Sequence, residues 1–172
     1  MKIYITSPLS DDNGNFIHRD AVITNFDDVL ARTKGRPTQA LFEEKHIPYV
    51  FRWIDDHPIS DFVPCDTGEF LMTGRAKEAL NDLLTPFGAF YDCTIDGDPY
   101  FNYISWNVIE PYDLSQPLEN AKGIVKHRFN ELAKSQHFFR VKRYPVQFVS
   151  QAVKDCYEAN NLTGLRFRLV GE

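Results

Sequence analysis

The sequence predicts an α+β fold, with a mostly antiparallel sheet and a few helices packed on it. Three observations lead to this prediction. Segments in which β-branched or aromatic residues alternate with polar ones follow one another with short turns between them, as neighbouring antiparallel strands do. Segments with a helical apolar stripe are few, whereas a parallel sheet needs a crossover helix for each strand pair. The 172 residues include 14 Phe and 8 Tyr, and aromatic residues favour strands.

Residues 1–70 give the weakest pattern. The expected elements are strands over 2–6 and 49–54, a tight turn over 10–15 at Asn13-Gly14, and a short helix over 38–46. Residues 16–26 fit either a strand pair or an irregular link. Residues 55–69 are rich in Asp and Pro, and we expect a loop there.

The pattern sharpens after residue 73. Apolar residues at helical spacing predict a core-facing helix, and they are Ala76, Ala79, Leu80, Leu83 and Leu84. Pro86-Phe87-Gly88 ends this helix. A hairpin follows, with strands over 89–95 and 100–109 joined by a turn at Asp96–Pro99. Ile104, Trp106 and Val108 fall on one face of the second strand.

The last third of the chain alternates strands with one more helix. Residues 119–136 fit either a strand or a helix, and short strands are predicted over 138–141 and 146–149. Ser150 is an N-cap residue for a helix that ends at Asn160-Asn161. The predicted buried stripe of this helix consists of Val153, Cys156 and Tyr157. In the predicted final strand, Leu165, Phe167 and Leu169 alternate with Arg166 and Arg168.

Length and composition indicate one globular domain over residues 1–172. This length supports a real core, and 43% hydrophobic and 25% charged residues are ordinary globular values. No run approaches the about 18 apolar residues of a membrane helix, and the first residues lack the apolar stretch of a signal peptide. Cys65, Cys93 and Cys156 show no CxxC spacing, so neither a disulfide framework nor a zinc site is indicated. We therefore expect a cytoplasmic protein.

Charge is unevenly distributed along the chain. Residues 1–125 carry 10 Lys/Arg and 20 Asp/Glu, whereas residues 126–172 carry 9 and 4. A net acidic chain with this distribution argues against a protein that coats nucleic acid. The acidic part can steer a basic partner toward it. The alternative is an acidic surface that provides solubility alone.

The residues give no indication of catalysis. No nucleophile motif and no phosphate-binding loop occurs. Asp55-Asp56-His57 and Cys65-Asp66 are metal-ligand types, but their spacing matches no zinc pattern. Asp113 lacks a second placed acid, and it is also suited to bond the backbone of Ser115 in a turn. We therefore predict neither an enzyme nor a protein with a metal or other cofactor.

The second half of the chain holds an ordered set of motifs. They are Trp106-Asn107-Val108, Tyr112-Asp113-Leu114, Phe138-Phe139-Arg140-Val141, Val146–Val149 with the helix that follows, and Leu162-Thr163-Gly164-Leu165-Arg166-Phe167. This order resembles immunity protein family 11 of bacterial polymorphic toxin systems. The resemblance covers about residues 70–170, so residues 71–172 are the expected family core. Residues 1–70 are left as a family-specific front region.

The resemblance implies a protein without enzymatic activity. Members of such systems are encoded beside secreted toxins, delivered for instance by type VI or contact-dependent secretion. The immunity protein binds and neutralises its cognate toxin, and we expect it to do so by occluding the toxin's active site. We interpret the motif residues as structural. Trp106, Phe139 and Phe167 are expected in the core, and Asn107, Asp113 and Gly164 are expected as turn or cap residues.

The toxin-binding residues are therefore expected on the acidic front, where carboxylates would attract a basic active-site cleft such as that of a nuclease. The acidic candidates are Asp11, Asp12, Asp55, Asp56, Asp61, Asp66 and Glu69. Trp53 and Phe62 are candidate apolar anchors, because aromatic residues carry much of the energy of an interface. The alternative is that both belong to the core.

Two other functions stay open at this point. One is a protein-interaction module unrelated to toxins, and the other is an enzyme that reverses a toxin's modification. No nucleic-acid or membrane partner is expected. The oligomeric state is left open by the sequence.

Overall fold

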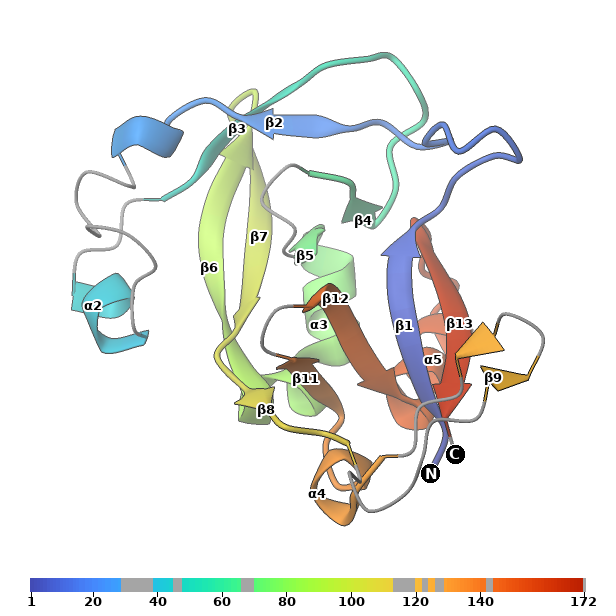
Figure 1. Ribbon diagram of the computed structural model, residues 1–172. Coiled ribbons are helices and arrows are strands. Elements are labelled where there is room, and N and C mark those ends of the chain that lie inside the picture. Colours follow the sequence, from blue (N-terminus) through green and yellow to red (C-terminus); the bar gives the residue numbers. More distant parts are fainter. Residues whose placement is uncertain are drawn as a thin grey trace.

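Two mixed sheets and the helices packed between and beside them make up the computed structural model (Figure 1). The structure describes residues 1–28, 39–44, 48–65, 70–112, 120–121, 124–125, 129–141 and 144–171. Most of the strand pairs are antiparallel; the pairs β3–β6 and β8–β11 are parallel. The predicted α+β class is confirmed.

The first sheet has five strands in the order β13-β1-β12-β11-β8. Their bounds are Ile3–Pro8 for β1, Val108–Ile109 for β8, Phe138–Val141 for β11, Tyr144–Ser150 for β12 and Leu165–Gly171 for β13. Tyr4 in β1 is paired with Val149 on one side and with Leu169 on the other. The N-terminal strand is thus built into a sheet made of C-terminal strands, and the two chain ends lie side by side (Figure 1).

The second sheet has six strands in the order β2-β3-β6-β7-β5-β4. Their bounds are Ala21–Ile23 for β2, Val50–Trp53 for β3, Phe62–Val63 for β4, Phe70–Met72 for β5, Gly88–Ile95 for β6 and Asp98–Ser105 for β7. The predicted hairpin is β6–β7, in register from Gly88↔Ser105 to Ile95↔Asp98. A separate pair joins β9 (Asn120–Ala121) to β10 (Ile124–Val125).

The helices with described bounds are α2 (Gln39–Glu44), α3 (Gly74–Leu84), the 3₁₀ turn η1 (Thr85–Phe87), α4 (Glu131–Lys134) and α5 (Gln151–Ala159). A capping side chain precedes α3, α4 and α5. Thr73 accepts a hydrogen bond from the Ala76 N–H, and Ser150 accepts one from Val153. Asn161, at φ +48°, follows α5 in the left-handed conformation that we expected to end it. The predicted N-cap Ser150 and the predicted stops of both long helices are therefore confirmed.

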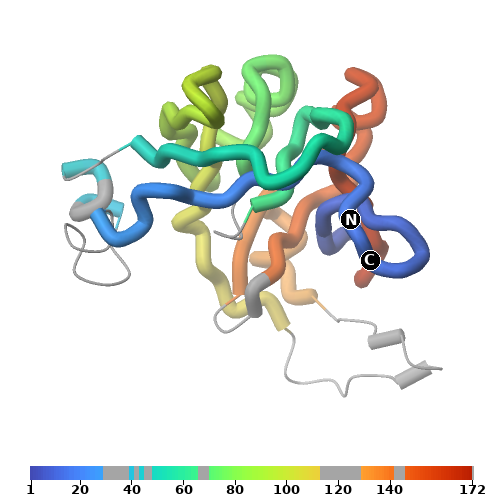
Figure 2. Tube along the Cα trace, turned by 90° about the horizontal axis from the view of Figure 1, so that it is seen from above, coloured from blue at the N-terminus to red at the C-terminus, as the bar shows by residue number. Residues whose placement is uncertain are grey.

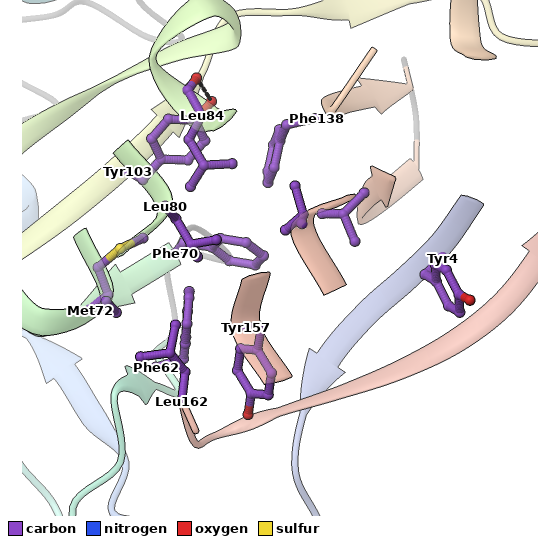
Figure 3. Packing of buried hydrophobic residues seen from close by; sticks show 13 residues of the cluster. Tyr4, Phe62, Phe70, Met72, Leu80, Leu84, Tyr103, Phe138, Tyr157 and Leu162 are labelled. Carbon is purple, nitrogen blue, oxygen red and sulfur yellow. Dashed lines mark hydrogen bonds between the residues drawn. The ribbon is translucent and has the colours of Figure 1, made fainter. Parts of the chain in front are cut away.

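One core lies where the two sheets meet α3 and α5 (Figure 3). It contains Tyr4, Phe62, Phe70, Met72, Ala76, Leu80, Leu84, Tyr103, Phe138, Val149, Val153, Tyr157 and Leu162. The Tyr103 hydroxyl donates to the Leu84 carbonyl at 2.8 Å, which satisfies its polar group inside the core. Both sheets contribute to this core. The expectation of one domain with a distinct front region stays a prediction.

Each sheet also buries its opposite face. On the five-stranded sheet, Phe139 and Phe148 stack with ring planes 2° apart and pack with Phe129 and Ala133. On the six-stranded sheet, Leu71 faces away from its neighbour Met72 and joins a cluster of buried residues. The members of that cluster are Ala21, Phe51, Val63, Leu71, Cys93, Ile95 and Tyr100. Because side chains alternate along a strand, each sheet packs one face into the shared core and the other face into a core of its own.

Two predicted segments differ from the structure. The strand expected over 100–109 ends at Ser105, because the Asn107 amide donates to the Phe138 carbonyl at 2.8 Å and draws the chain into the other sheet as β8. Val108 is consequently exposed, which makes the predicted apolar face of this strand wrong. The loop expected over 55–69 contains β4, whose Phe62 pairs with Met72 in β5. In the ambiguous stretch 119–136, the described elements are β9, β10 and α4.

Candidate partner-binding surface

Two segments of the acidic front lie side by side and contribute β2 and β3 to the six-stranded sheet. We call them the front ribbon: residues 16–25 and 48–60. The core of the ribbon is the antiparallel pair β2–β3. The pairing continues beyond the strands, since Ile54 N–H donates to the Asp20 carbonyl at 3.2 Å and Arg19 N–H donates to the Pro58 carbonyl at 2.9 Å. Figure 2 shows the two segments crossing the molecule together.

The inner face of the ribbon holds it on the body of the protein. Phe51 is buried in the cluster formed with Leu71, Cys93 and Ile95. Trp53 is half-buried and meets the Tyr100 ring edge-on at a centroid distance of 5.9 Å. Residues with the opposite parity in β3 therefore point outward.

Asp11 and Asp12 lie in the turn that precedes the ribbon. The Asp11 Oδ1 atom accepts hydrogen bonds from the N–H groups of Asn13 and Asn15, each at 2.9 Å. The bond from Asn15 is the main cause that lowers the pKa of Asp11 from its ordinary value. Gly14 takes φ +86°, as the predicted turn requires. Asp12 is exposed, and within the described residues no hydrogen bond engages its carboxylate.

Asp55 and Asp56 form an acidic turn at the middle of the ribbon. The Asp55 carboxylate accepts from His57 N–H at 2.9 Å and from Asp20 N–H at 3.1 Å. Burial raises the pKa of Asp55, but these two bonds lower it more, so the pKa lies below its ordinary value. The Asp56 side chain is fully exposed and pairs with Arg19 at 3.4 Å. Asp56 is thus available to a partner.

Arg19 fixes the position of this acidic turn. Its Nε atom donates to the His57 carbonyl at 3.0 Å, and its guanidinium lies 5.4 Å from the centroid of the Trp53 ring. One cation is therefore shared among a backbone carbonyl, an aromatic face and a carboxylate. The positive charge is largely satisfied within the chain, and the turn keeps its acidic character.

Phe62 and Asp61 lie in the interior. Phe62 is 2% exposed and packs against Phe70 and Tyr157, so it belongs to the core, as the alternative interpretation held. Asp61 is 8% exposed. Neither side chain presents a surface to a partner in this structure, because each is enclosed by its own chain.

Asp61 instead joins the front to the C-terminal motif. Its carboxylate accepts from Arg75 Nη2 at 2.7 Å, from Thr163 N–H at 2.9 Å and from the Thr73 hydroxyl at 3.1 Å. Burial raises the pKa of Asp61, but the bonds from Arg75, Thr163 and Thr73 outweigh it, so the pKa is lowered. An acceptor with this many donors is a structural residue.

Gly164, in the same motif, crosses the front at a distance that only glycine permits. It has φ +104°, and a Cβ atom there would lie 2.2 Å from the Phe62 carbonyl oxygen. Its own carbonyl accepts from Leu9 N–H at 3.0 Å, and the Thr163 carbonyl accepts from Phe62 N–H at 3.0 Å. The predicted turn role of Gly164 is therefore accompanied by a second one, the close contact of two distant segments.

The remaining candidates and motif residues are distributed as follows. Asp66, Glu69 and Asp113 lie outside the described residues. Phe139 is fully buried, whereas Trp106 and Phe167 are half-buried. The structure brings Trp53, Asp55 and Asp56 together in the front ribbon and places Asp11 and Asp12 in the turn that leads into it. The sequence analysis did not select three residues of the ribbon: Arg19, Ile54 and Ile59. For Ile54, its position next to the inward-facing Trp53 in an alternating strand pattern could have indicated that its side chain is exposed.

Catalytic geometry is not evident among the described residues. The Nδ1 atom of His137 lies 2.9 Å from Ser150 Oγ, which is the spacing of a nucleophile and its base. Ser150 is fully buried and caps α5, so its hydroxyl is already used and has no access to a substrate. No three His, Cys, Asp or Glu side chains gather as metal ligands in the described part of the chain. None of the described helices is long and apolar enough to cross a membrane.

A cavity of ≈ 240 Å³ lies between the two sheets. Its walls are mostly apolar, with Phe62, Phe70 and Leu165 among them, and Thr6 supplies a hydroxyl without a hydrogen-bond partner among the described residues. Ser7 and Gln147 also line the cavity, but its described lining contains no His, Asp, Glu, Lys or Arg side chain that could act as an acid or a base on a substrate. The surface of the ribbon is therefore the better candidate for function.

Comparison with known families identifies the C-terminal part of the chain. Residues 107–172 match the sequence model of the Immunity protein family (Imm11). The predicted resemblance is confirmed over this range, which begins at Asn107 and includes β8, β11, β12, α5 and β13. No curated protein sequence matches the chain.

Proposed function

We propose that this protein is an immunity protein that binds and neutralises a cognate secreted toxin in the cytoplasm of the producing or a neighbouring cell. The match of residues 107–172 to the Immunity protein family carries this proposal. The scaffold role of the motif residues and the burial of the Ser150 hydroxyl beside His137 support binding in preference to catalysis.

Neutralisation proceeds by occlusion of the toxin's active site, with the front ribbon and the turn before it as the contact surface. Asp12 and Asp56 project their carboxylates to solvent, and Asp11 and Asp55 lie beside them in ordered turns. Such a surface attracts a basic cleft and speeds association. Trp53 supports the surface from below. The proposed contact does not include Asp61 and Phe62, because both side chains are buried.

The test is protection by the chain against the toxin encoded in the adjacent reading frame. Bacteria that express this toxin domain should grow only when the full chain is co-expressed, and the two proteins should co-purify. A chain with Phe139→Asp serves as the control, because it disrupts a fully buried residue and should abolish both readouts. Failure of the intact, folded chain to bind or protect would refute the function.

A titration separates occlusion from enzymatic reversal. An occluding protein removes toxin activity in proportion to its own amount, so inhibition should be complete at equimolar chain. An enzyme that reverses the toxin's product acts at a small fraction of that amount. Protection at substoichiometric chain, without a complex on gel filtration, would exclude the occlusion proposed here.

A further inference from the structure

Exposed apolar side chains are concentrated on the front. The described residues contain ten large hydrophobic side chains that are exposed. Six of them lie between residues 16 and 59: Phe16, Ile17, Phe26, Val50, Ile54 and Ile59. Isolated exposed apolar residues are common, so an interaction site is indicated only where such residues are neighbours on an ordered segment.

Ile54 and Ile59 enclose the acidic turn. Ile54 is 55% exposed and Ile59 is 53% exposed, and Asp55 and Asp56 lie between them in sequence. Ile54 follows the outward parity of β3, opposite to Phe51 and Trp53, so it points away from the core beneath the ribbon. Both segments of the ribbon are held by backbone hydrogen bonds at Asp20 and at Pro58. The apolar pair is thus presented on an ordered backbone.

We infer that Ile54 and Ile59 are the main apolar contacts of the toxin-binding surface, on either side of the Asp55–Asp56 turn in the sequence, and that they fit a basic protein surface with apolar recesses. This inference rests on the proposed function and specifies its contact. Protein interfaces combine apolar contacts with charged and polar groups, and both kinds of group are present here. The candidate anchors of the sequence, Trp53 and Phe62, are replaced because they face inward.

Charge complementarity indicates which kind of partner binds this surface. A second copy of the chain that docked by this surface about a twofold axis would place one acidic turn against the other. Such like-charge contact is unfavourable at an interface. A basic partner instead pairs with Asp56, whose carboxylate is fully exposed and makes one ion pair, to Arg19. The ordered ribbon also lowers the entropy lost on binding.

The experiment uses the purified toxin domain of the adjacent reading frame, inactivated at its catalytic residue, and measures Kd by calorimetry. Ile54→Ser and Ile59→Ser should each weaken binding roughly tenfold, and the double variant roughly a hundredfold, because each removes an apolar contact without changing charge. Leu132→Ser is the matched control: Leu132 is 52% exposed on α4, inside the family-matched region. It should leave Kd within about twofold of the wild type.

The outcomes separate this inference from the proposed function. Thermal melting of each variant verifies folding, and a further pair, Ile54→Ala and Ile59→Ala, replaces any variant that is unfolded. Wild-type Kd in a folded double variant would overturn the surface while leaving the immunity function intact. Absence of binding by the wild-type chain would refute the function itself. A wild-type dimer in sedimentation that the double variant dissociates would assign the surface to self-association and overturn the toxin contact.

Discussion

The family-matched region, residues 107–172, and the front ribbon differ in how many of their faces are buried. In the matched region, both faces of the five-stranded sheet are covered: Phe138 points into the core shared with the other sheet, and Phe139 points into the second core. In the ribbon, only the inner face is covered: Phe51 is buried, whereas Ile54 is exposed. The matched region is therefore constrained by its own packing, and the ribbon's outer face is not.

This difference explains why the recognisable motif and the candidate contact surface are separate. Motif residues such as Asn107 and Gly164 are required by contacts inside the chain, to the Phe138 carbonyl and to the Phe62 carbonyl. The outer face of the ribbon has no such requirement, so it is free to be specific for a partner. The matched region is joined to the residue that follows the ribbon, because the Thr163 N–H donates to the Asp61 carboxylate. Stability is expected to depend on this junction, and binding on the ribbon.

The largest expected effect is at the junction. Gly164→Ala should lower the free energy of unfolding by about 4 kcal/mol, because left-handed strain adds to a clash of Cβ with backbone. Gly14→Ala is the matched control, since Gly14 has a similar φ of +86° but nothing within 4 Å of the Cβ position. It should cost about 1 kcal/mol. Denaturant titration measures both, and equal losses would show that the close contact at Gly164 is unimportant.

A second substitution tests the same junction by its charge. Asp61→Ala should destabilise the protein by about 3 kcal/mol, because it leaves the Thr163 N–H and the Thr73 hydroxyl without their acceptor. Asp56→Ala removes an exposed ion pair and should cost less than about 1 kcal/mol. A loss of similar size at both positions would contradict the assignment of Asp61 to structure and Asp56 to the surface.

The pH dependence of stability sharpens this assignment. The pKa of Asp61 is lowered in the folded protein, so its stabilisation is complete above the unfolded value of about 3.9 and is lost as pH falls through the folded pKa. In that range the unfolded chain binds more protons than the folded one, and acid favours unfolding. The stability gap between wild type and Asp61→Asn should therefore narrow below about pH 4. A gap that stays constant in acid would exclude ionised Asp61 as its source.

Local sequence patterns predicted the two long helices and missed the short strands and the strand pairings between segments far apart in the sequence. The apolar stripes predicted α3 and α5, and Ser150 predicted the start of α5, because a helix is stabilised by residues close in sequence. The two-residue strand β4 is too short to show alternation. The pairing of Ile3 with Ser150 places the N-terminal strand in the C-terminal sheet, and no local pattern carries this information.

The same limit applies to the candidate site. Asp55 and Asp56 lie in an exposed turn, as an Asp- and Pro-rich loop leads one to expect. Asp61 has the same residue type and the same surroundings in sequence, but one of its hydrogen-bond donors, Thr163, lies 102 positions away. Composition does not distinguish an acid that faces solvent from one that accepts hydrogen bonds from a distant segment.

The smallest effect on stability is expected from charge reversal at two exposed acids, one in the ribbon and one in the turn before it. The same change tests whether this surface acts electrostatically. Asp12→Lys with Asp56→Lys should change the free energy of unfolding by less than about 1 kcal/mol, because both side chains are exposed. The association rate with the toxin domain should fall roughly tenfold at low salt, and less at high salt, because steering is screened.

The control for this variant reverses two exposed acids on α3, Glu78→Lys with Asp82→Lys, which gives the same net charge. If net charge alone steers the toxin, both double variants slow association equally. A slower rate only in the ribbon variant places the acidic contact at the ribbon, because steering depends on where the charges lie relative to the docking surface. Equal rates in both variants and the wild type would leave the ribbon with no electrostatic role, and its contact would then depend on Ile54 and Ile59.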